Sequence, residues 1–257
     1  MSKKALILGL SIAFIIAVLK FSHTTELIQT PNENKVNPTQ HPAQINNSKI
    51  YTSDDTTILV IQATPSQVKL ISNLDANLTA LEAREKYSCK FLTSAGFYTE
   101  NHKPVGLFQT DNTVAETAKK NSTFNGFLSV DRKGKTNISP SNPPVDTVFT
   151  LQTGPLLIAN FDALNLQIKN DKKARRIVAA IDSNNTLLLI AVYTRASAFS
   201  GPELTDLPFI IKKISDENTL NISDAINLDG GTASAYLSDN VVLNEASPVG
   251  SFLCVIN

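Results

Sequence analysis

The sequence predicts a mixed α+β fold, in which a large, mostly antiparallel sheet carries a few short helices within a single globular domain. Three observations predict it. Short apolar runs typical of strands outnumber the segments with helical spacing. Polar turn sequences separate several of these runs at the distance expected for hairpins. The chain has 257 residues, which is enough for one complete hydrophobic core.

The first 22 residues have the composition of an export segment. Lys3 and Lys4 precede a mostly apolar stretch from Ala5 to Leu19. This stretch is shorter than the roughly 20 residues of a membrane span and fits the core of a signal peptide. No clear small-x-small cleavage site follows, so a cleaved signal and a retained anchor both stay open. We expect residues 1–22 to export the protein to the periplasm or the exterior and to be its only contact with a membrane.

Residues 23–55 are expected to be a flexible linker. They are rich in Asn, Gln, Thr and Pro and contain few large apolar side chains, so they cannot bury enough surface to offset their ordering entropy. The folded domain is therefore expected to span residues 56–257.

The first half of this domain is predicted to be largely extended. Strands are expected at Thr57–Gln62, Val68–Ser72, Cys89–Thr93, Val105–Gln109, Phe124–Val130 and Lys135–Ile138. We expect the first two to pair with each other and the last two to form a hairpin. A helix is predicted over Leu78–Tyr87 with Asn77 as its N-cap, and residues 111–123 are expected to form a loop.

The second half repeats this pattern. Strands are expected at Val148–Gln152, Leu156–Ile158, Ile177–Ile181, Leu187–Tyr193, Ala225–Leu228, Val241–Leu243 and Phe252–Ile256. Asp182–Asn185 joins two of these as a second hairpin. A helix is predicted over Leu204–Ile214, with Pro208 either in its first turn or at a kink.

Composition excludes several classes of function. Lys and Arg together number 23 and match the 23 acidic residues, so no basic surface for nucleic acid is expected. The three histidines are His23, His41 and His102, of which the first two precede the domain. A histidine triad or a zinc site is therefore poorly supported. No Gly-x-Ser-x-Gly, Walker or Gly-x-Gly-x-x-Gly motif occurs, and we expect neither a metal nor a cofactor.

Three polar clusters at predicted strand ends are candidates for a site. The first is Asn227-Leu228-Asp229-Gly230-Gly231, with Ser234 shortly after it. The second is Gln152-Thr153-Gly154-Pro155, and the third is the pair Arg175-Arg176. A guanidinium can bind phosphate through two hydrogen bonds. Each cluster also has an ordinary interpretation, as a turn between strands or a solvated surface pair.

Taken in order, these clusters resemble the phosphodiester glycosidase domain family, which has lysosomal members and bacterial members associated with exopolysaccharides. The similarity is carried by five segments: Ser94–Tyr98, Lys103–Leu107, Leu151–Ile158, Arg176 with its strand, and Ala225–Ser234. It extends over residues 57–257. The resemblance implies hydrolysis of a sugar joined through its anomeric carbon to a phosphodiester, with a carbohydrate phosphodiester as the partner molecule.

Carried over to this sequence, the family's site residues are Gly96, Gln152, Gly154, Arg176, Asp229, Gly230 and Ser234, to which we add Ser94 and Gly231. Asp229 and Arg176 are the expected catalytic pair. Arg176 would neutralise the departing phosphate, and Asp229 would stabilise the oxocarbenium-like centre or activate water. Gln152 and Ser94 would orient sugar hydroxyls. Asp182 and Glu100 are reserve candidates for a second carboxylate.

The chain departs from the family pattern at two positions. Ser94 stands where the family usually has Asn, and Ala233 replaces a common Ser. A serine reaches less far than a carboxamide and offers fewer hydrogen bonds. Two other functions therefore stay open: a non-catalytic module that binds glycans or envelope polymers, and a structural envelope protein without a small ligand.

Cys89 and Cys254 are the only cysteines. In an oxidising compartment they are candidates for one disulfide. The alternative is a pair of buried free thiols, which pack as small apolar side chains.

Overall fold

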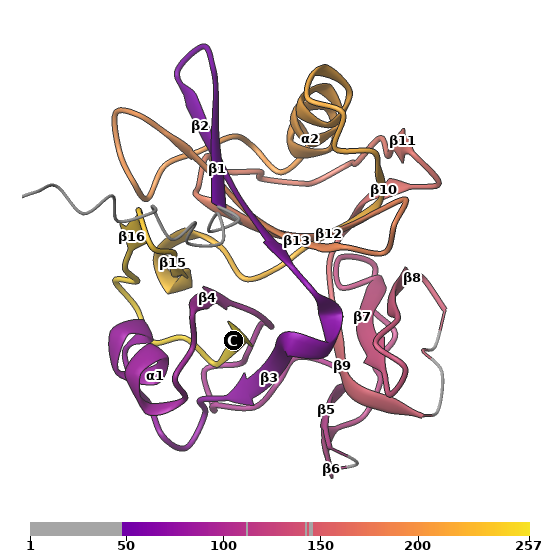
Figure 1. Cartoon of the computed structure of the whole chain (residues 1–257), viewed down its shortest axis with the longest axis vertical. Coiled ribbons are helices and arrows are strands. Elements are labelled where there is room, and N and C mark those ends of the chain that lie inside the picture. Colours follow the sequence, from indigo (N-terminus) through magenta and orange to yellow (C-terminus); the bar gives the residue numbers. More distant parts are fainter. Residues whose placement is uncertain (1–47, 112, 142, 144–145) are drawn as a thin grey trace, which may run out of the picture. The chain divides into compact units, whose positions relative to one another are not determined.

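The computed structural model describes residues 48–111, 113–141, 143 and 146–257 (Figure 1). The expected export segment and residues 23–47 of the expected linker lie outside this range. The described chain contains three antiparallel sheets and two short α-helices, which confirms the predicted fold class. The strands are divided among three sheets where one large sheet was expected. No helix in the described ranges is both long enough and apolar enough to cross a membrane.

The largest sheet has seven strands. In spatial order they are β1 (Ser48–Ser53), β2 (Thr56–Ala63), β13 (Leu187–Thr194), β12 (Arg176–Asp182), β14 (Ile222–Asn227), β10 (Leu156–Ala159) and β11 (Asp162–Ala163). Its central strands bury both faces. On β2, Leu59 and Ile61 point into the main core, whereas Ile58 and Val60 point to the opposite side. Two buried faces explain why these strands are continuous apolar runs instead of alternating sequences.

Two five-stranded sheets complete the main core. One contains β16 (Val242–Leu243), β15 (Tyr236–Leu237), β4 (Phe91–Ser94), β17 (Ser251–Val255) and β3 (Val68–Ser72). The other contains β6 (Thr113–Glu116), β5 (Phe108–Thr110), β9 (Thr147–Thr153), β7 (Gly126–Asp131) and β8 (Thr136–Ser139). Side chains from all three sheets, including Leu59, Phe91 and Leu128, meet in one apolar cluster.

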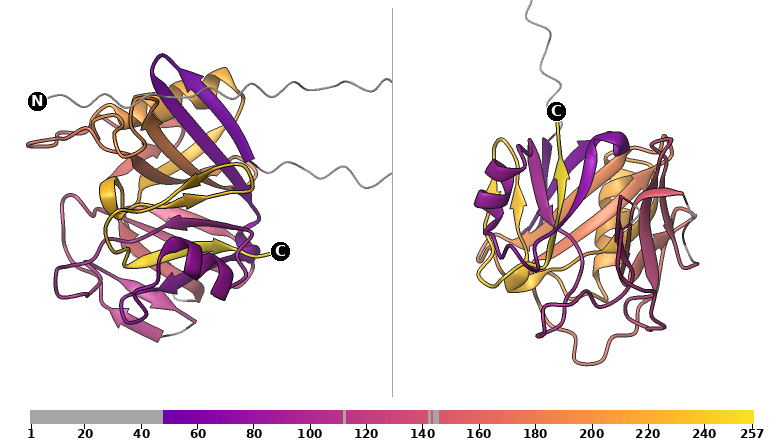
Figure 2. Two further views of the ribbon diagram at one scale, coloured as in Figure 1. Left: turned by 90° about the vertical axis from the view of Figure 1, so that its left-hand side faces the viewer. Right: turned by 90° about the horizontal axis from the view of Figure 1, so that it is seen from below.

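The helices cover outer faces of two sheets. Helix α2 (Leu207–Glu217) places Ile211 and Ile214 against the outer face of the seven-stranded sheet, close to β10 and β11 (Figure 1). Pro208 lies in its first turn, where a missing amide hydrogen costs nothing. Helix α1 (Ala80–Lys86) packs against β4 in the second sheet (Figure 2).

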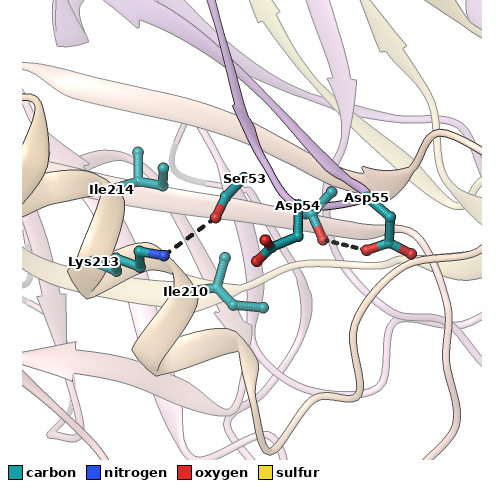
Figure 3. Close-up of a pocket in the computed structure, with 7 residues that line it drawn as sticks. Ser53, Asp54, Asp55, Ile210, Lys213 and Ile214 are labelled. Atoms are coloured by element: carbon teal, nitrogen blue, oxygen red, sulfur yellow. Dashed lines mark hydrogen bonds between the residues drawn. The ribbon is translucent and has the colours of Figure 1, made fainter.

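The turn between β1 and β2 lies beside α2. Lys213 donates a hydrogen bond of 3.3 Å to the Ser53 hydroxyl, and Ile210 and Ile214 lie beside the turn (Figure 3). A small hollow of about 190 Å³ remains between them. This contact ties the first strand of the described chain to the helix.

The structure corrects four expectations about the elements. Strand β3 pairs with β17 at the far end of the chain, not with β2, because the short 3₁₀ turn Pro65–Gln67 redirects it into another sheet. Strand β1 lies inside the expected linker, so the sheet begins at Ser48. The segment 111–123 contains strand β6. Helix α1 begins later than expected, with Thr79 and not Asn77 as its N-cap.

The start of α1 follows from a capping box. The Thr79 hydroxyl accepts a hydrogen bond from the Glu82 amide, and the Glu82 carboxylate accepts one from the Thr79 amide at 2.8 Å. This reciprocal pair satisfies two amides that a helix otherwise leaves open. It outweighs the capping capacity of Asn77 alone.

Candidate functional site

A cavity of about 290 Å³ opens where β14 ends. Four residues from this strand end line it: Asn227, Asp229, Gly230 and Gly231. Asn227 is the last residue of β14 and Asp229 follows in the bend after it, and both line the cavity. The predicted cluster at the end of this strand is therefore part of a real concave site.

Because β14 lies between β12 and β10, different side chains line the cavity on its two sides. On the β12 side the cavity is lined by Arg176, Ala174 and Leu204. On the β10 side it is lined by Gly154 and by the loop residue Phe124, with Phe97 and Thr123 beside it. We call these the guanidinium flank and the aromatic flank. Asp229 lies between them.

Two glycines allow the chain to close around the cavity. Gly154 has φ +150°, and a Cβ there would lie 2.5 Å from the Thr123 carbonyl oxygen. Gly231 has φ +65° and donates its amide to the Arg175 carbonyl at 2.7 Å. Positive φ values of this kind favour glycine over other residues. Both glycines line the cavity, so their backbone can come close to a bound ligand.

The backbone of Asp229 is hydrogen-bonded to the end of β4 in the second sheet. Its amide donates to the Ala95 carbonyl at 2.8 Å, and its own carbonyl accepts a hydrogen bond of 2.9 Å from the Ser94 hydroxyl. Only 8% of the residue is exposed. Burial raises the pKa of Asp229 to about 8, although the Gly230 amide opposes this rise. The carboxyl group therefore holds a proton for most of the time at neutral pH.

Arg176 is anchored along one edge of its guanidinium group. Nε donates to the Pro202 carbonyl at 3.1 Å, and Nη2 donates to the Lys172 carbonyl. Nη2 also lies 3.4 Å from a carboxylate oxygen of Asp171. Burial lowers the pKa of Arg176, while Asp171 and Glu203 oppose that effect. An arginine keeps its charge despite such a shift.

The aromatic flank is formed by a pair of phenyl rings. The centroids of Phe97 and Phe124 lie 4.7 Å apart at an interplanar angle of 42°. Beside them, the Asn227 side chain donates to the Gly154 carbonyl at 3.1 Å, and its Oδ1 has no partner among the described residues. Neither ring is among the site residues that the sequence predicts, although Phe97 lies in the segment Ser94–Tyr98.

Four of the expected site residues do not line the cavity. Ser94 and Ser234 are fully buried, and their hydroxyls bond to the carbonyls of Asp229 and Gly231, the latter at 2.6 Å. Gly96 packs where a Cβ would lie 2.5 Å from Leu151. The fourth is Gln152. These residues support the walls of the cavity from behind.

Gln152 organises the loop that carries Phe124. Its carbonyl oxygen accepts hydrogen bonds from the amides of Leu107 at 3.1 Å and Lys119 at 2.9 Å. Its amide group donates to the carbonyls of Phe124 at 3.0 Å and of Lys119. Every polar group of the side chain is thus bonded to backbone, which leaves none to orient a sugar hydroxyl.

The burial of Arg175 behind the cavity could not be predicted from the sequence. It is fully buried, donates from Nε to the Ser234 hydroxyl at 2.8 Å, and lies over the Phe199 ring at 4.8 Å. Burial lowers its pKa to about 10, opposed by Glu245. Adjacent residues of a strand point to opposite sides, but nothing in the sequence decides which arginine faces the cavity.

The reserve carboxylates lie elsewhere. Asp182 is at the opposite end of β12 from Arg176, and its carboxylate caps the hairpin turn by accepting from the amides of Asn184 and Thr186. Glu100 is exposed in a turn. Asp229 is thus the one carboxyl group lining the cavity within the described ranges. Those ranges also contain no group of three or more His, Cys, Asp or Glu residues that could hold a metal ion.

The candidate disulfide is present. Cys89 and Cys254 are bonded and close a loop with a sequence separation of 165 residues. The bond lies in the apolar cluster between α1 and the second sheet, away from the cavity.

Comparison with known proteins gives one family and a related fold. A sequence profile of the family described as phosphodiester glycosidase (NAGPA) matches residues 87–256. The structure is similar to the zebrafish N-acetylglucosamine-1-phosphodiester alpha-N-acetylglucosaminidase catalytic domain auto-inhibited by its pro-peptide, with a TM-score of 0.59 and 15% identity, covering 82% of this chain and 81% of that one. It is also similar to a hypothetical protein from Synechocystis, with a TM-score of 0.60 and 12% identity, covering 80% and 61%. No curated protein sequence matches the chain.

Proposed function

Because the chain belongs to the phosphodiester glycosidase family, we propose that it hydrolyses a sugar-1-phosphodiester to a free sugar and a phosphate monoester. The observation that carries this proposal is the cavity itself. It combines a proton-holding carboxyl group, an arginine and two aromatic rings at the end of one strand. Perturbed ionisable groups in a cleft are typical of catalytic sites.

The two flanks suggest how the substrate lies. An anionic phosphate fits the guanidinium flank, where Arg176 supplies positive charge. The apolar face of a sugar ring fits against the phenyl rings of Phe97 and Phe124 on the aromatic flank. The scissile bond between the anomeric carbon and the phosphate oxygen then lies over Asp229, which is between the flanks.

One carboxyl group can carry both halves of the reaction. In its protonated form Asp229 adds no negative charge to a cavity that must admit a phosphodiester anion. As the C–O bond breaks, the bonding electrons go to the phosphate oxygen, which takes the Asp229 proton. The resulting carboxylate stabilises the oxocarbenium-like centre and then accepts a proton from the water that attacks the anomeric carbon. This regenerates the acid form of Asp229.

The substrate and compartment are part of the proposal. N-acetylglucosamine-1-phosphodiesters are the first substrates to test, because the zebrafish protein of similar fold is named for them. We place the protein in the periplasm or outside the cell, since disulfides persist in oxidising compartments. Residues 1–22 are proposed as the export signal or anchor and the following polar residues as a linker.

Replacing Asp229 by Asn tests the assignment. Asn keeps the shape and neutrality of the protonated side chain but has no proton to transfer, so sugar release from a sugar-1-phosphodiester should fall by at least about 100-fold. Asp224→Asn is the matched control, because Asp224 lies on the same strand outside the cavity. Wild-type rates for Asp229→Asn would refute the assignment. Binding without turnover in the wild type would instead indicate a glycan-binding module.

A further inference from the structure

Behind the guanidinium flank lies a half-buried ion pair, of which the proposed chemistry uses only Arg176. Asp171 lies 3.4 Å from Nη2 of Arg176, and the two side chains are only 10% and 12% exposed. Asp171 is itself fixed. One of its oxygens accepts from the Thr205 amide at 2.8 Å and the Thr205 hydroxyl at 3.0 Å, and the other accepts from the Lys172 amide at 2.9 Å.

This arrangement limits what Arg176 can offer to a ligand. Nε and Nη2 are occupied by the Pro202 carbonyl, the Lys172 carbonyl and Asp171. Nη1 has no hydrogen-bond partner among residues 48–257 as far as the structure describes them. A phosphate can therefore accept hydrogen bonds from Nη1 alone, and not from two nitrogens of the guanidinium group at once.

Part of the positive charge of the flank is cancelled. Asp171 offsets the positive charge of Arg176 at close range, and Glu203 acts in the same direction. Lys172 and Lys173 are exposed, so solvent screens their charges. A phosphodiester carries one negative charge, which the remaining positive charge of Arg176 can compensate. A phosphate monoester carries two, and the residues lining the cavity supply no further positive charge for the second.

We propose that Asp171 is a positioning residue that makes the site prefer singly charged phosphodiesters over doubly charged phosphate monoesters. It does so through Arg176, by holding one edge of the guanidinium group and cancelling part of its charge. The consequence is easy release of the phosphate monoester product. This inference rests on the proposed function, because it assumes that Arg176 faces the phosphate.

Binding measurements can test it without turnover. The ligands are N-acetylglucosamine 1-phosphate and its methyl phosphodiester, measured by calorimetry at pH 7.5 with the full chain carrying Asp229→Asn. Adding Asp171→Asn should strengthen monoester binding on the order of tenfold and diester binding clearly less, because removal of a nearby negative charge acts on each ligand charge. Thr205→Val is the control, since it removes one hydrogen bond to Asp171 and keeps the charge. It should change the ratio of the two affinities by less than about twofold.

Three results would overturn the inference: an unchanged ratio of the two affinities in Asp171→Asn, an equal change of the ratio in Thr205→Val, or no binding of either ligand. If Asp171→Asn does not fold, the protein carrying Asp229→Asn alone still tests the charge preference on which the role of Asp171 depends. The monoester loses its second charge below a pKa of about 6. Monoester binding should therefore strengthen relative to diester binding between pH 7.5 and pH 5, whereas Glu203, Lys172 and Lys173 act on both ligands. A constant ratio would contradict the inference. An inactive protein that shows these shifts would refute the hydrolysis and not the charge preference.

Discussion

At the residue scale, Asp229 is where stability and the proposed chemistry conflict. A carboxyl group that is 8% exposed and raised in pKa to about 8 is costly to ionise inside the fold. The same burial gives the group a proton at neutral pH. Ser94 and Ala95 hold its backbone in place, so the side chain cannot escape to solvent by a small shift.

The rate should depend on pH in a direction that identifies the active form of Asp229. If catalysis begins from the protonated form, kcat/KM falls as pH rises through about 8, the pKa of this group in the folded protein. A pH–rate profile between pH 5 and pH 10 checks this. A rate that instead rises through pH 8 would mean that the carboxylate is the active form.

The raised pKa of Asp229 should make the protein less stable as pH rises. The folded pKa lies above the usual value of 3.8, so between about pH 4 and pH 8 the folded state binds a proton that the unfolded state has lost. Asp229 therefore lowers the free energy of unfolding progressively as pH rises through this range. Asp229→Asn should remove that loss and be more stable than the wild type by a few kcal/mol at pH 9, with little difference at pH 4. Urea unfolding at both pH values measures it, and a difference independent of pH would contradict it.

At the element scale, the cavity depends on a loop that one side chain holds. Gln152 on β9 bonds to backbone groups of Leu107, Lys119 and Phe124. Gly106 allows this contact, because a Cβ there would collide with the Gln152 side chain. The Phe124 loop is thus positioned by a strand of the third sheet, whereas Asp229 follows a strand of the first.

Gln152→Ala should weaken both the loop and the site. It leaves several backbone groups without partners, which should lower the free energy of unfolding by about 2–3 kcal/mol. KM should rise more than kcat falls, because the proposed substrate placement puts Phe124 against the sugar and away from the reacting bond. Gln109→Ala on neighbouring β5 is the control, since the Gln109 side chain makes no hydrogen bond among the described residues. A destabilised Gln152→Ala with unchanged KM would show that the loop does not shape the cavity.

At the scale of the whole molecule, residues far apart in sequence are joined by sheet pairing and by one covalent bond. Strand β17 at the end of the chain pairs with β3 and β4 near its beginning, and Cys254 on β17 is bonded to Cys89. The second sheet, which holds Asp229 in place, therefore depends on contacts between the two ends of the domain.

Removing the disulfide should cost stability without changing the chemistry. Closing so long a loop restricts the unfolded chain, so Cys89→Ser with Cys254→Ser should lower the free energy of unfolding by about 2–5 kcal/mol. The remaining folded protein should keep its kcat, because the bond does not line the cavity. Denaturation and rate assays on the same samples check both statements. A loss of kcat in fully folded protein would contradict the second.

The sequence predicted most of the longer strands and the cluster at the end of β14 because these are local patterns, whereas β1 and β6 were missed. The apolar hairpin of β12 and β13 and the run ending in Asp229-Gly230-Gly231 are recognisable without partners. The roles of Ser94, Gln152 and Arg175 depend on contacts with distant segments, such as the bond from Ser94 to a carbonyl 135 residues away. The division into three sheets could not be predicted either, since strand partners are chosen by tertiary packing.

Hydrolysis in water labelled with ¹⁸O tests the central claim most directly. A sugar-1-phosphodiester is incubated with the protein until partial turnover, and the products are separated for mass spectrometry. If Asp229 promotes cleavage at the anomeric carbon, the label enters the sugar, the phosphate monoester stays unlabelled, and Asp229→Asn abolishes both products. Label in the phosphate would mean that the protein breaks the P–O bond and is not a glycosidase of the proposed kind.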